Sequence, residues 1–255
     1  MAAVDLNCDL GESFGSYRLG LDEQVIPHIT SANVACGWHG GDPLVMEKTV
    51  ALCREYGVRV GAHPSYPDLM GFGRRAMSIT PDEARAYVKY QIGALRAFCH
   101  AQGLELQHVK PHGALYNAMG KDPALAEAVC RGIRECGGGL IVMALAGSAA
   151  VDAARRLGLP VAQEVFADRA YEEDGSLVDR RKPGAMITNE EEAIARVVRM
   201  VTQGKATAIT GKEMDIEAHS VCVHGDGPKA LQFVQKISRA LRENGVRLVP
   251  LCEVL

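Results

Sequence analysis

Aromatic side chains are scarce in this 255-residue sequence: they make up 5% of it and include a single tryptophan, Trp38. Proteins that bind single-stranded nucleic acid stack the bases on aromatic rings, and many sugar-binding sites use such rings as walls. The composition therefore argues against a nucleic-acid partner and disfavours a polysaccharide substrate. The formal net charge of −3 is small, and no block of like charge offers a broad face to a phosphate backbone or an anionic membrane.

Long hydrophobic runs and closely paired cysteines are also missing. No apolar run approaches the roughly 20 residues that a membrane-spanning helix needs. The first residues lack the basic and then apolar pattern of a secretory leader, so we expect a cytoplasmic protein without membrane association. The eight cysteines form no C-x-x-C pair, which argues against zinc-ribbon and thioredoxin motifs.

The usual nucleotide-binding fingerprints are absent as well. The sequence contains no G-x-x-x-x-G-K-[ST] phosphate loop, and no G-x-G-x-x-G follows a predicted strand. Any nucleotide site is therefore of another kind or belongs to a partner.

Short apolar runs alternate with amphipathic segments from one end of the chain to the other. One apolar stripe, with helical spacing, joins Ala84, Val88, Ile92 and Leu95. The segment Thr80–Glu83 carries a capping Thr, then Pro, then Glu at the third position, which predicts a helix start there. The predicted strands are Val4–Leu6, Ala32–Cys36, Val58–Ala62, Leu106–Lys110, Leu140–Ala144, Val161–Glu164, Ala206–Ile209, Val221–Val223 and Arg247–Val249.

This alternation predicts an α/β fold with a parallel sheet, either a closed barrel or an open doubly wound sheet. We favour the barrel, because seven or more strand–helix units occur and no linker rich in Pro, Gly or Ser divides the chain. The prediction is one domain, residues 1–255, forming a single TIM-like (β/α) barrel, irregular and seven-stranded. The longest irregular stretches, 63–79 and 165–188, are expected to shape a site.

Ionisable residues follow strand after strand, where active sites of parallel β/α folds form. Asp5, Asn7 and Asp9 alternate along an extended segment, so they should all point into the barrel. Taken singly, such a residue is often only a helix cap, and Asp42 and Asp226 are the clearest examples. Charged groups in a barrel mouth are nevertheless costly unless they pair or coordinate something. The assembly of acids and histidines therefore favours proton transfer or metal binding.

Seven strings at these strand ends resemble the LamB/YcsF family. The resemblance runs from about Asp5 to Val249, with one minor departure at Gly40, where alanine is expected. The strings are DLNCDLGE at 5–12, ANVACGWHGGDP at 32–43, GAHPSYPD at 61–68, GFGRR at 71–75, KPHGALYN at 110–117, EVFADRAY at 164–171 and VHGD at 223–226.

The resemblance implies a (β/α) barrel related to glycoside hydrolase and sugar deacetylase barrels. It also implies the activity of an ATP-hydrolysing 5-oxoprolinase: cleavage of 5-oxo-L-proline to L-glutamate with hydrolysis of ATP to ADP and phosphate. The chain would act as the A subunit of that enzyme, with subunits B and C as partners. ATP would be a co-substrate used by the complex.

Roles for the matching residues follow from that chemistry, which needs a base for water and cations for carboxylate and phosphoryl charge. We expect Asp9 or Asp5 to act as base, and His63 and His112 to polarise the substrate or relay protons. Lys110 would neutralise the developing charge, and Arg74 would hold the substrate carboxylate. The remaining predicted substrate-binding residues are Asn7, Glu12, Asn33, His39, Asp68, Asn117, Glu164, Asp168, Arg169 and His224.

Metal binding and two other functions remain open at the level of sequence. Related deacetylase barrels hold a divalent ion with one aspartate and two histidines, which Asp9, His63 and His112 would match here. The alternative is a metal-free hydrogen-bonded cluster. A stand-alone metal-dependent deacetylase or amidohydrolase would act without ATP. A non-catalytic subunit would bind substrate while its partners react.

Overall fold

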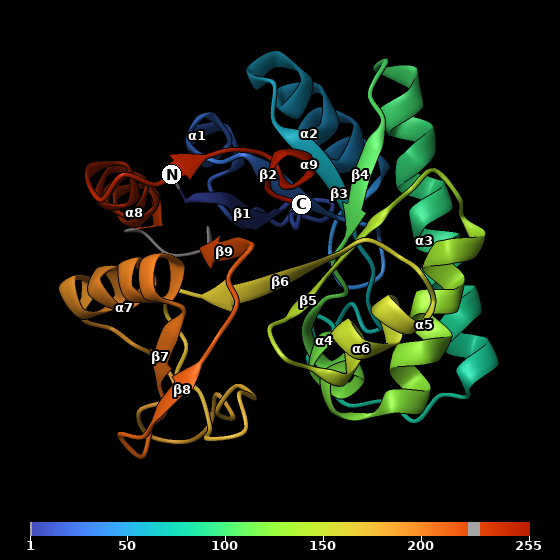
Figure 1. The fold of residues 1–255 in the computed structure, drawn as a ribbon. Coiled ribbons are helices and arrows are strands. Elements are labelled where there is room, and N and C mark those ends of the chain that lie inside the picture. Colours follow the sequence, from blue (N-terminus) through green and yellow to red (C-terminus); the bar gives the residue numbers. More distant parts are fainter. Residues whose placement is uncertain (1, 224–229) are drawn as a thin grey trace.

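Seven parallel strands close into a barrel in the computed structural model, which describes residues 2–223 and 230–255 (Figure 1). Each strand pairs with the next along the ring, and β1 closes it by pairing with β9. The single α/β barrel with seven strands is thus confirmed. The strands are β1 (Ala3–Leu10), β2 (Ser31–Ala35), β3 (Arg59–His63), β4 (Leu106–Val109), β5 (Ile141–Leu145), β6 (Val161–Phe166) and β9 (Ser220–Val223).

Two predicted strands lie outside the ring. The first half of the run 206–209 lies in β7 (Lys205–Thr207), which forms an antiparallel hairpin with β8 (Glu213–Asp215). The run 247–249 forms β10 (Arg247–Leu248), which pairs with β1 beyond the barrel. Neither belongs to the seven-stranded barrel, because β6 pairs directly with β9 and β9 pairs with β1 to close the ring.

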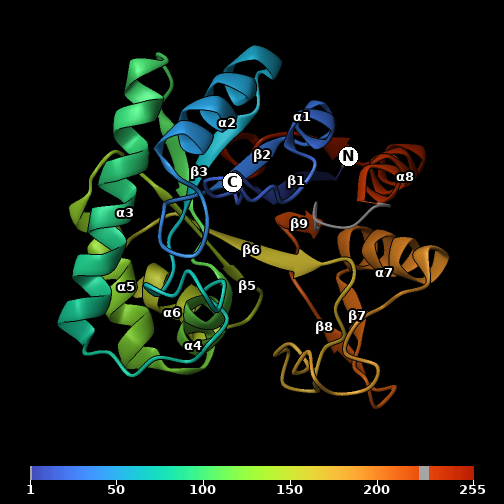
Figure 2. The ribbon, with the colours of Figure 1, turned by 180° about the vertical axis from the view of Figure 1, so that it is seen from behind.

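Helices surround the barrel on its outer side (Figures 1 and 2). Both views place α3 to α6 on one side, and α7, α8 and the β7–β8 hairpin on the other. The helices are α1 (Asp22–Val25), η1 (Ile26–His28), α2 (Pro43–Tyr56), α3 (Pro81–Ala101), α4 (Gly113–Lys121), α5 (Pro123–Glu135), α6 (Ala149–Arg156), α7 (Glu190–Gln203), α8 (Ala230–Glu243) and α9 (Leu251–Val254).

Local sequence signals fix the ends of these helices. Thr80 and Glu83 form the predicted capping box at the start of α3. Asp42 and Asp122 each accept two backbone N–H bonds at the starts of α2 and α5, so both act as helix caps. None of the helices within residues 2–223 and 230–255 has the length and apolar character of a bilayer span.

The hydrophobic core lies between the outer surface of the barrel and the helices. The predicted α3 stripe is fully buried there: Val88, Ile92 and Leu95 are each 0% exposed. Burial of each such side chain contributes about 1.5–3 kcal/mol. Leu6 and Cys8 of β1 join this outer core, so their neighbours on the strand face the barrel interior. That interior is polar, and it carries the candidate site.

Candidate active site

Asp5 lies deepest on the inner face of β1, far from the carboxyl end of the strand. The hydroxyl groups of Thr30 and Ser31 each donate a hydrogen bond of 2.6 Å to Oδ1, and the Ser220 hydroxyl donates to Oδ2. The side chain is 0% exposed. Burial raises the pKa of Asp5 to about 6, against the opposing effect of the three hydroxyl donors. This geometry is that of an internal anchor.

Asn33 of β2 links the next two residues of the β1 inner face. Its amide nitrogen donates to Oδ1 of Asn7 at 2.7 Å and to Oδ1 of Asp9 at 2.9 Å. Its own oxygen accepts a bond of 2.7 Å from Nε2 of His108. The His108 ring reaches Asn33 by crossing Gly61, where an added Cβ would lie 2.0 Å from Nε2. Glycine is therefore required at position 61, and His108 is a buried core histidine.

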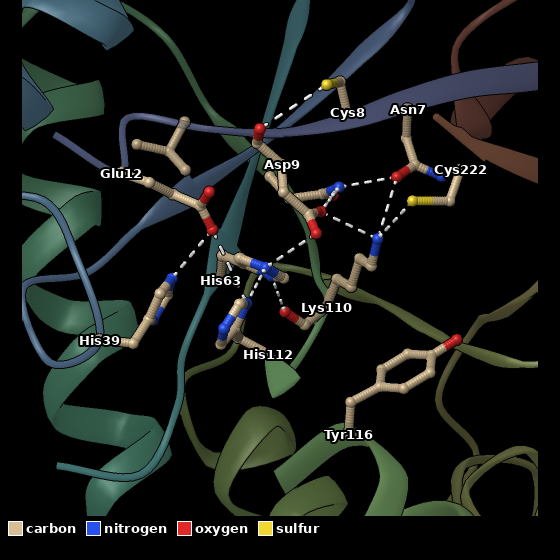
Figure 3. A network of polar contacts seen from close by, with 12 residues as sticks. Asn7, Cys8, Asp9, Glu12, His39, His63, Lys110, His112, Tyr116 and Cys222 are labelled. Carbon is tan, nitrogen blue, oxygen red and sulfur yellow. Dashed lines mark hydrogen bonds and ion pairs between the residues drawn. The ribbon is translucent and has the colours of Figure 1, made fainter. Parts of the chain in front are cut away.

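Lys110 extends from the end of β4 into the centre of the barrel (Figure 3). Its Nζ lies 2.9 Å from Oδ1 of Asp9 and 2.7 Å from Oε1 of Glu164. It is also 3.2 Å from Oδ1 of Asn7 and from Sγ of Cys222. Burial alone would lower the pKa of Lys110, but the neighbouring charges, chiefly Asp9, raise it well above its ordinary value. The site therefore holds a permanent, nearly fully buried ammonium group.

Glu164 is the second acid of this centre, and it is 0% exposed. Besides the Lys110 contact, it accepts a bond of 3.0 Å from Nδ2 of Asn7 and one of 2.6 Å from the Tyr116 hydroxyl. Burial and the nearby Glu164 raise the pKa of Tyr116 well above its ordinary value. Tyr116 therefore keeps its hydroxyl proton and holds the Glu164 carboxylate in place as a hydrogen-bond donor.

His63 and His112 face each other at the mouth, with His112 Nδ1 at 2.9 Å from His63 Nε2. Their other nitrogens contact backbone oxygens: His63 Nδ1 lies 2.6 Å from the Lys110 carbonyl, and His112 Nε2 lies 2.9 Å from the Phe72 carbonyl. His63 Nε2 is also 3.4 Å from Oδ2 of Asp9. Both rings are almost fully buried. Burial and the adjacent histidines hold the pKa of His112 well below its ordinary range.

Two further residues complete the mouth. The His39 ring stacks on the His112 ring with centroids 3.8 Å apart, and its Nε2 lies 3.4 Å from Oε1 of Glu12. The same oxygen is 3.8 Å from Nδ1 of His112. Burial and the neighbouring His63 hold the pKa of His39 well below its ordinary range. Glu12, His39, His63 and His112 together form what we call the mouth cluster, whose ligand-type atoms lie within 4.8 Å of one another.

The β3–α3 loop closes over this cluster. The Phe72 ring meets the rings of His39 and His112 edge to face, with centroids 5.5 and 5.2 Å apart. The exposed Arg74 guanidinium lies over the outer face of Phe72, 4.9 Å from the ring centroid. Gly73 adopts a φ of +63°, and a Cβ there would come within 2.8 Å of the His112 ring, so glycine allows the close approach. Arg74 is thus the cation at the rim.

Other predicted substrate-binding residues lie apart from this centre. Asp68 accepts hydrogen bonds from Gly71 N–H and from Arg75, so it holds the β3–α3 loop together. Asn117 is exposed on α4. His224 lies outside the described residues.

Asp168 and Arg169 follow β6 at the start of the long loop to α7. Arg169 is buried, and its Nη2 donates a bond of 2.6 Å to the Val178 carbonyl, so it supports that loop. Burial lowers the pKa of Arg169 to about 10. Asp168 is partly exposed beside it.

Sequence reasoning did not single out Tyr116 or Cys222 as site residues, although both contact the Lys110–Glu164 centre. Two-residue alternation from Ser220 would have placed Cys222 on the inner face. Burial raises the pKa of Cys36 to about 12 and that of Cys8 well above its ordinary value, which disfavours the nucleophilic thiolate at these two positions. In the described part of the chain all eight cysteines are free.

A cavity of about 590 Å³ lies elsewhere, between the loop after β5 and the β7–β8 hairpin. Its lining includes Gly147, Arg155, Gln163, Met214 and Glu217. None of the predicted site residues lines it, so it is separate from the chemistry of the barrel mouth.

Comparisons with known proteins agree with this architecture. The chain is 62% identical to the A subunit of 5-oxoprolinase from Clostridium beijerinckii and 59% identical to that from Pyrococcus horikoshii, covering 99–100% of both chains in each pair. The crystal structure of a lactam utilization protein from Thermus thermophilus superposes with a TM-score of 0.92 at 44% identity, over 97% of this chain and 99% of that one. The family model for LamB/YcsF matches residues 4–255, and the chain therefore belongs to the LamB/YcsF family.

Proposed function

We propose that this chain is the A subunit of a cytoplasmic 5-oxoprolinase, which opens 5-oxo-L-proline to L-glutamate while ATP is hydrolysed to ADP and phosphate. Relatives with that name match it over the whole length at about 60% identity. We further propose that residues 1–255 act as one domain and that subunits B and C are its partners.

One observation carries the proposal: a buried ammonium at a barrel mouth, in contact with two carboxylates and next to a pair of imidazoles. A lactam is a weakly electrophilic amide, and charge develops on its oxygen when it is attacked. Fixed positive charge in a site of low dielectric stabilises that development. The adjacent acid and imidazoles supply the proton transfers that ring opening needs.

In the proposed sequence the lactam oxygen takes the γ-phosphoryl group of ATP, and ADP leaves. A water then adds to the activated carbon as its proton passes to a base. The ring C–N bond breaks, with the nitrogen protonated, and leaves an acyl phosphate. A second water hydrolyses that group, which gives glutamate and phosphate.

Asp9 fits the role of base better than Asp5. Its carboxylate stands at the carboxyl end of β1 with Oδ2 facing His63, whereas Asp5 is enclosed by three hydroxyl groups at the other end. We propose that Lys110 neutralises the oxyanion or phosphoryl charge. Arg74, at the rim, would hold the substrate carboxylate.

ATP is assigned to the complex. The sequence has no phosphate-binding loop of the usual kinds, so a partner protein or a shared interface would supply much of the nucleotide site. The deep site of this chain would then receive the lactam and activate water.

The test is glutamate release from 5-oxoproline by the chain alone, by the chain with subunits B and C, and by the complex without ATP. The proposal expects turnover only in the complete mixture. Turnover by the chain alone without ATP would replace it with a stand-alone amidohydrolase. Asp9→Asn and His112→Ala should abolish ring opening, whereas Lys48→Met, at an exposed lysine, should not. If those variants no longer bind 5-oxoproline but the partner subunits still hydrolyse ATP, this chain would instead be a non-catalytic, substrate-binding subunit.

A further inference from the structure

The proton positions on His63 and His112 leave an unusual contact at the barrel mouth. A carbonyl oxygen only accepts hydrogen bonds, so His63 Nδ1 and His112 Nε2 must each carry the hydrogen that they give to the Lys110 and Phe72 carbonyls. In neutral rings the remaining nitrogens carry lone pairs. Those two lone pairs point at each other across 2.9 Å. The contact is repulsive unless a cation or an additional proton lies between them.

His39 adds a third imidazole with the same need. The residue is 1% exposed, and neither ring nitrogen makes a hydrogen bond within the described part of the chain. A buried polar group without a hydrogen bond costs about 1–3 kcal/mol. Its Nε2 points toward the Glu12 carboxylate, which also reaches His112 (Figure 3). Three nitrogen donors and one oxygen donor thus converge from β1, β2, β3 and β4 or the loops after them.

We propose that the mouth cluster, Glu12, His39, His63 and His112, binds one divalent transition-metal ion of the zinc type.

The donor set and its spacing fit such an ion. Imidazole nitrogen and carboxylate oxygen bind zinc at about 2.0–2.2 Å, so two donors in the tetrahedral shell that zinc prefers lie about 3.4 Å apart. The donor atoms of the mouth cluster lie within 4.8 Å of one another, so side-chain shifts of about an ångström or less bring them into such a ligand shell. Metal-bound histidines also donate their other N–H to a carbonyl or carboxylate, as His63 and His112 do here.

This ligand set differs from the one expected from sequence. His63 and His112 are common to both, but Glu12 and His39 take the place given to Asp9. Oδ1 of Asp9 already accepts hydrogen bonds from Lys110 and Asn33, which orients the carboxylate toward the ammonium group. Asp9 is then a neighbour of the ion, positioned to act on a water at the mouth.

The experiment uses the full-length chain without an affinity tag, stripped with EDTA and titrated with Co²⁺ and with Zn²⁺. We expect one ion per chain, a visible Co²⁺ ligand-field spectrum, and a higher Tm on binding. No spectrum and no stoichiometric uptake would overturn the site. A proton shared between His63 and His112, seen by nitrogen-15 NMR together with absent metal uptake, would explain the contact instead.

Matched variants identify the ligands. Glu12→Gln and His39→Gln should each weaken metal binding by at least tenfold, the lower end of the effect of changing even outer-shell partners. Asp9→Asn should keep the affinity within a few-fold, and His100→Gln, at an exposed histidine of α3, should leave it unchanged. Loss with Asp9→Asn and retention with Glu12→Gln would refute this ligand set. Because metal uptake is measured without turnover, the result is separable from failure of the proposed lactam chemistry.

Discussion

Replacement of Lys110 by methionine tests the centre of the site most directly. The side chain is nearly isosteric, but the change removes the ammonium group that contacts Asp9 and Glu164 at 2.9 and 2.7 Å. Lys110 is 2% exposed and Glu164 0% exposed, so water cannot take over these contacts. Removing one partner of a buried ion pair costs about 3–5 kcal/mol. We therefore expect Lys110→Met to lower the free energy of unfolding by that amount.

Urea unfolding followed by circular dichroism measures this loss. The matched control is Lys48→Met, because Lys48 pairs with Glu23 at 2.5 Å with both side chains more than 60% exposed. Exposed pairs contribute about 0–1 kcal/mol. Equal losses in the two variants would refute the claim that burial makes the Lys110 contacts strong.

A double variant separates stability from chemistry. Glu164→Gln removes one of the two negative charges that Lys110→Met leaves behind, so the pair of changes should recover part of the lost stability. Activity of the complex should stay at least about a hundredfold below wild type, the typical cost of losing one group that stabilises transition-state charge. Recovery of both stability and activity would show that Lys110 has only a structural role.

Three further predictions address other parts of the barrel. Gly61→Ala places a Cβ 2.0 Å from His108 Nε2 and should cost about 1–3 kcal/mol of unfolding free energy, with a smaller loss in a His108→Ala background. The pKa of Asp5 is about 6, against an ordinary value of 3.8, so the native state binds this proton more tightly than the unfolded chain does. The resulting stabilisation of the folded state is complete below about pH 4 and is lost as the pH rises through about 6. Asp5→Asn should therefore gain about 3 kcal/mol relative to wild type over that interval, and parallel pH profiles in urea unfolding would contradict it. Arg74→Lys should raise the KM for 5-oxoproline about tenfold with little change in kcat, while Arg75→Lys, next to it but paired with Asp68, should change KM little.

Most of the fold could be predicted from local patterns. The helix caps at Thr80 and Asp42 were predicted from short-range chemistry and occur in the structure. The barrel strands were found because apolar runs bounded by helices leave few alternatives. A short apolar run does not reveal its partner strand, and the run at 206–209 pairs with β8 in an antiparallel hairpin outside the barrel. Which strands form the barrel depends on pairings such as that of Glu164 with Ser220, which are distant in sequence.

The candidate site was predicted in part. Alternation along β1 correctly placed Asp5, Asn7 and Asp9 on one face, but it could not tell an anchor from a group at the mouth. The depth of each side chain along the barrel axis separates the buried anchor from the residues at the mouth. That depth depends on how neighbouring strands are staggered. The approach of Glu12 and His39 to His63 and His112 likewise depends on loop geometry, including the positive φ of Gly73.

The charges at the mouth connect the ammonium group with the proposed metal ion. Lys110 contacts Asp9 and Glu164, whereas Glu12 lies 3.8 Å from His112 within the mouth cluster. Charged groups in a site of low dielectric favour local compensation. A divalent ion on the mouth cluster would add positive charge beside Glu12 and near Asp9, so the ammonium group and the ion would together stabilise the acids of the site.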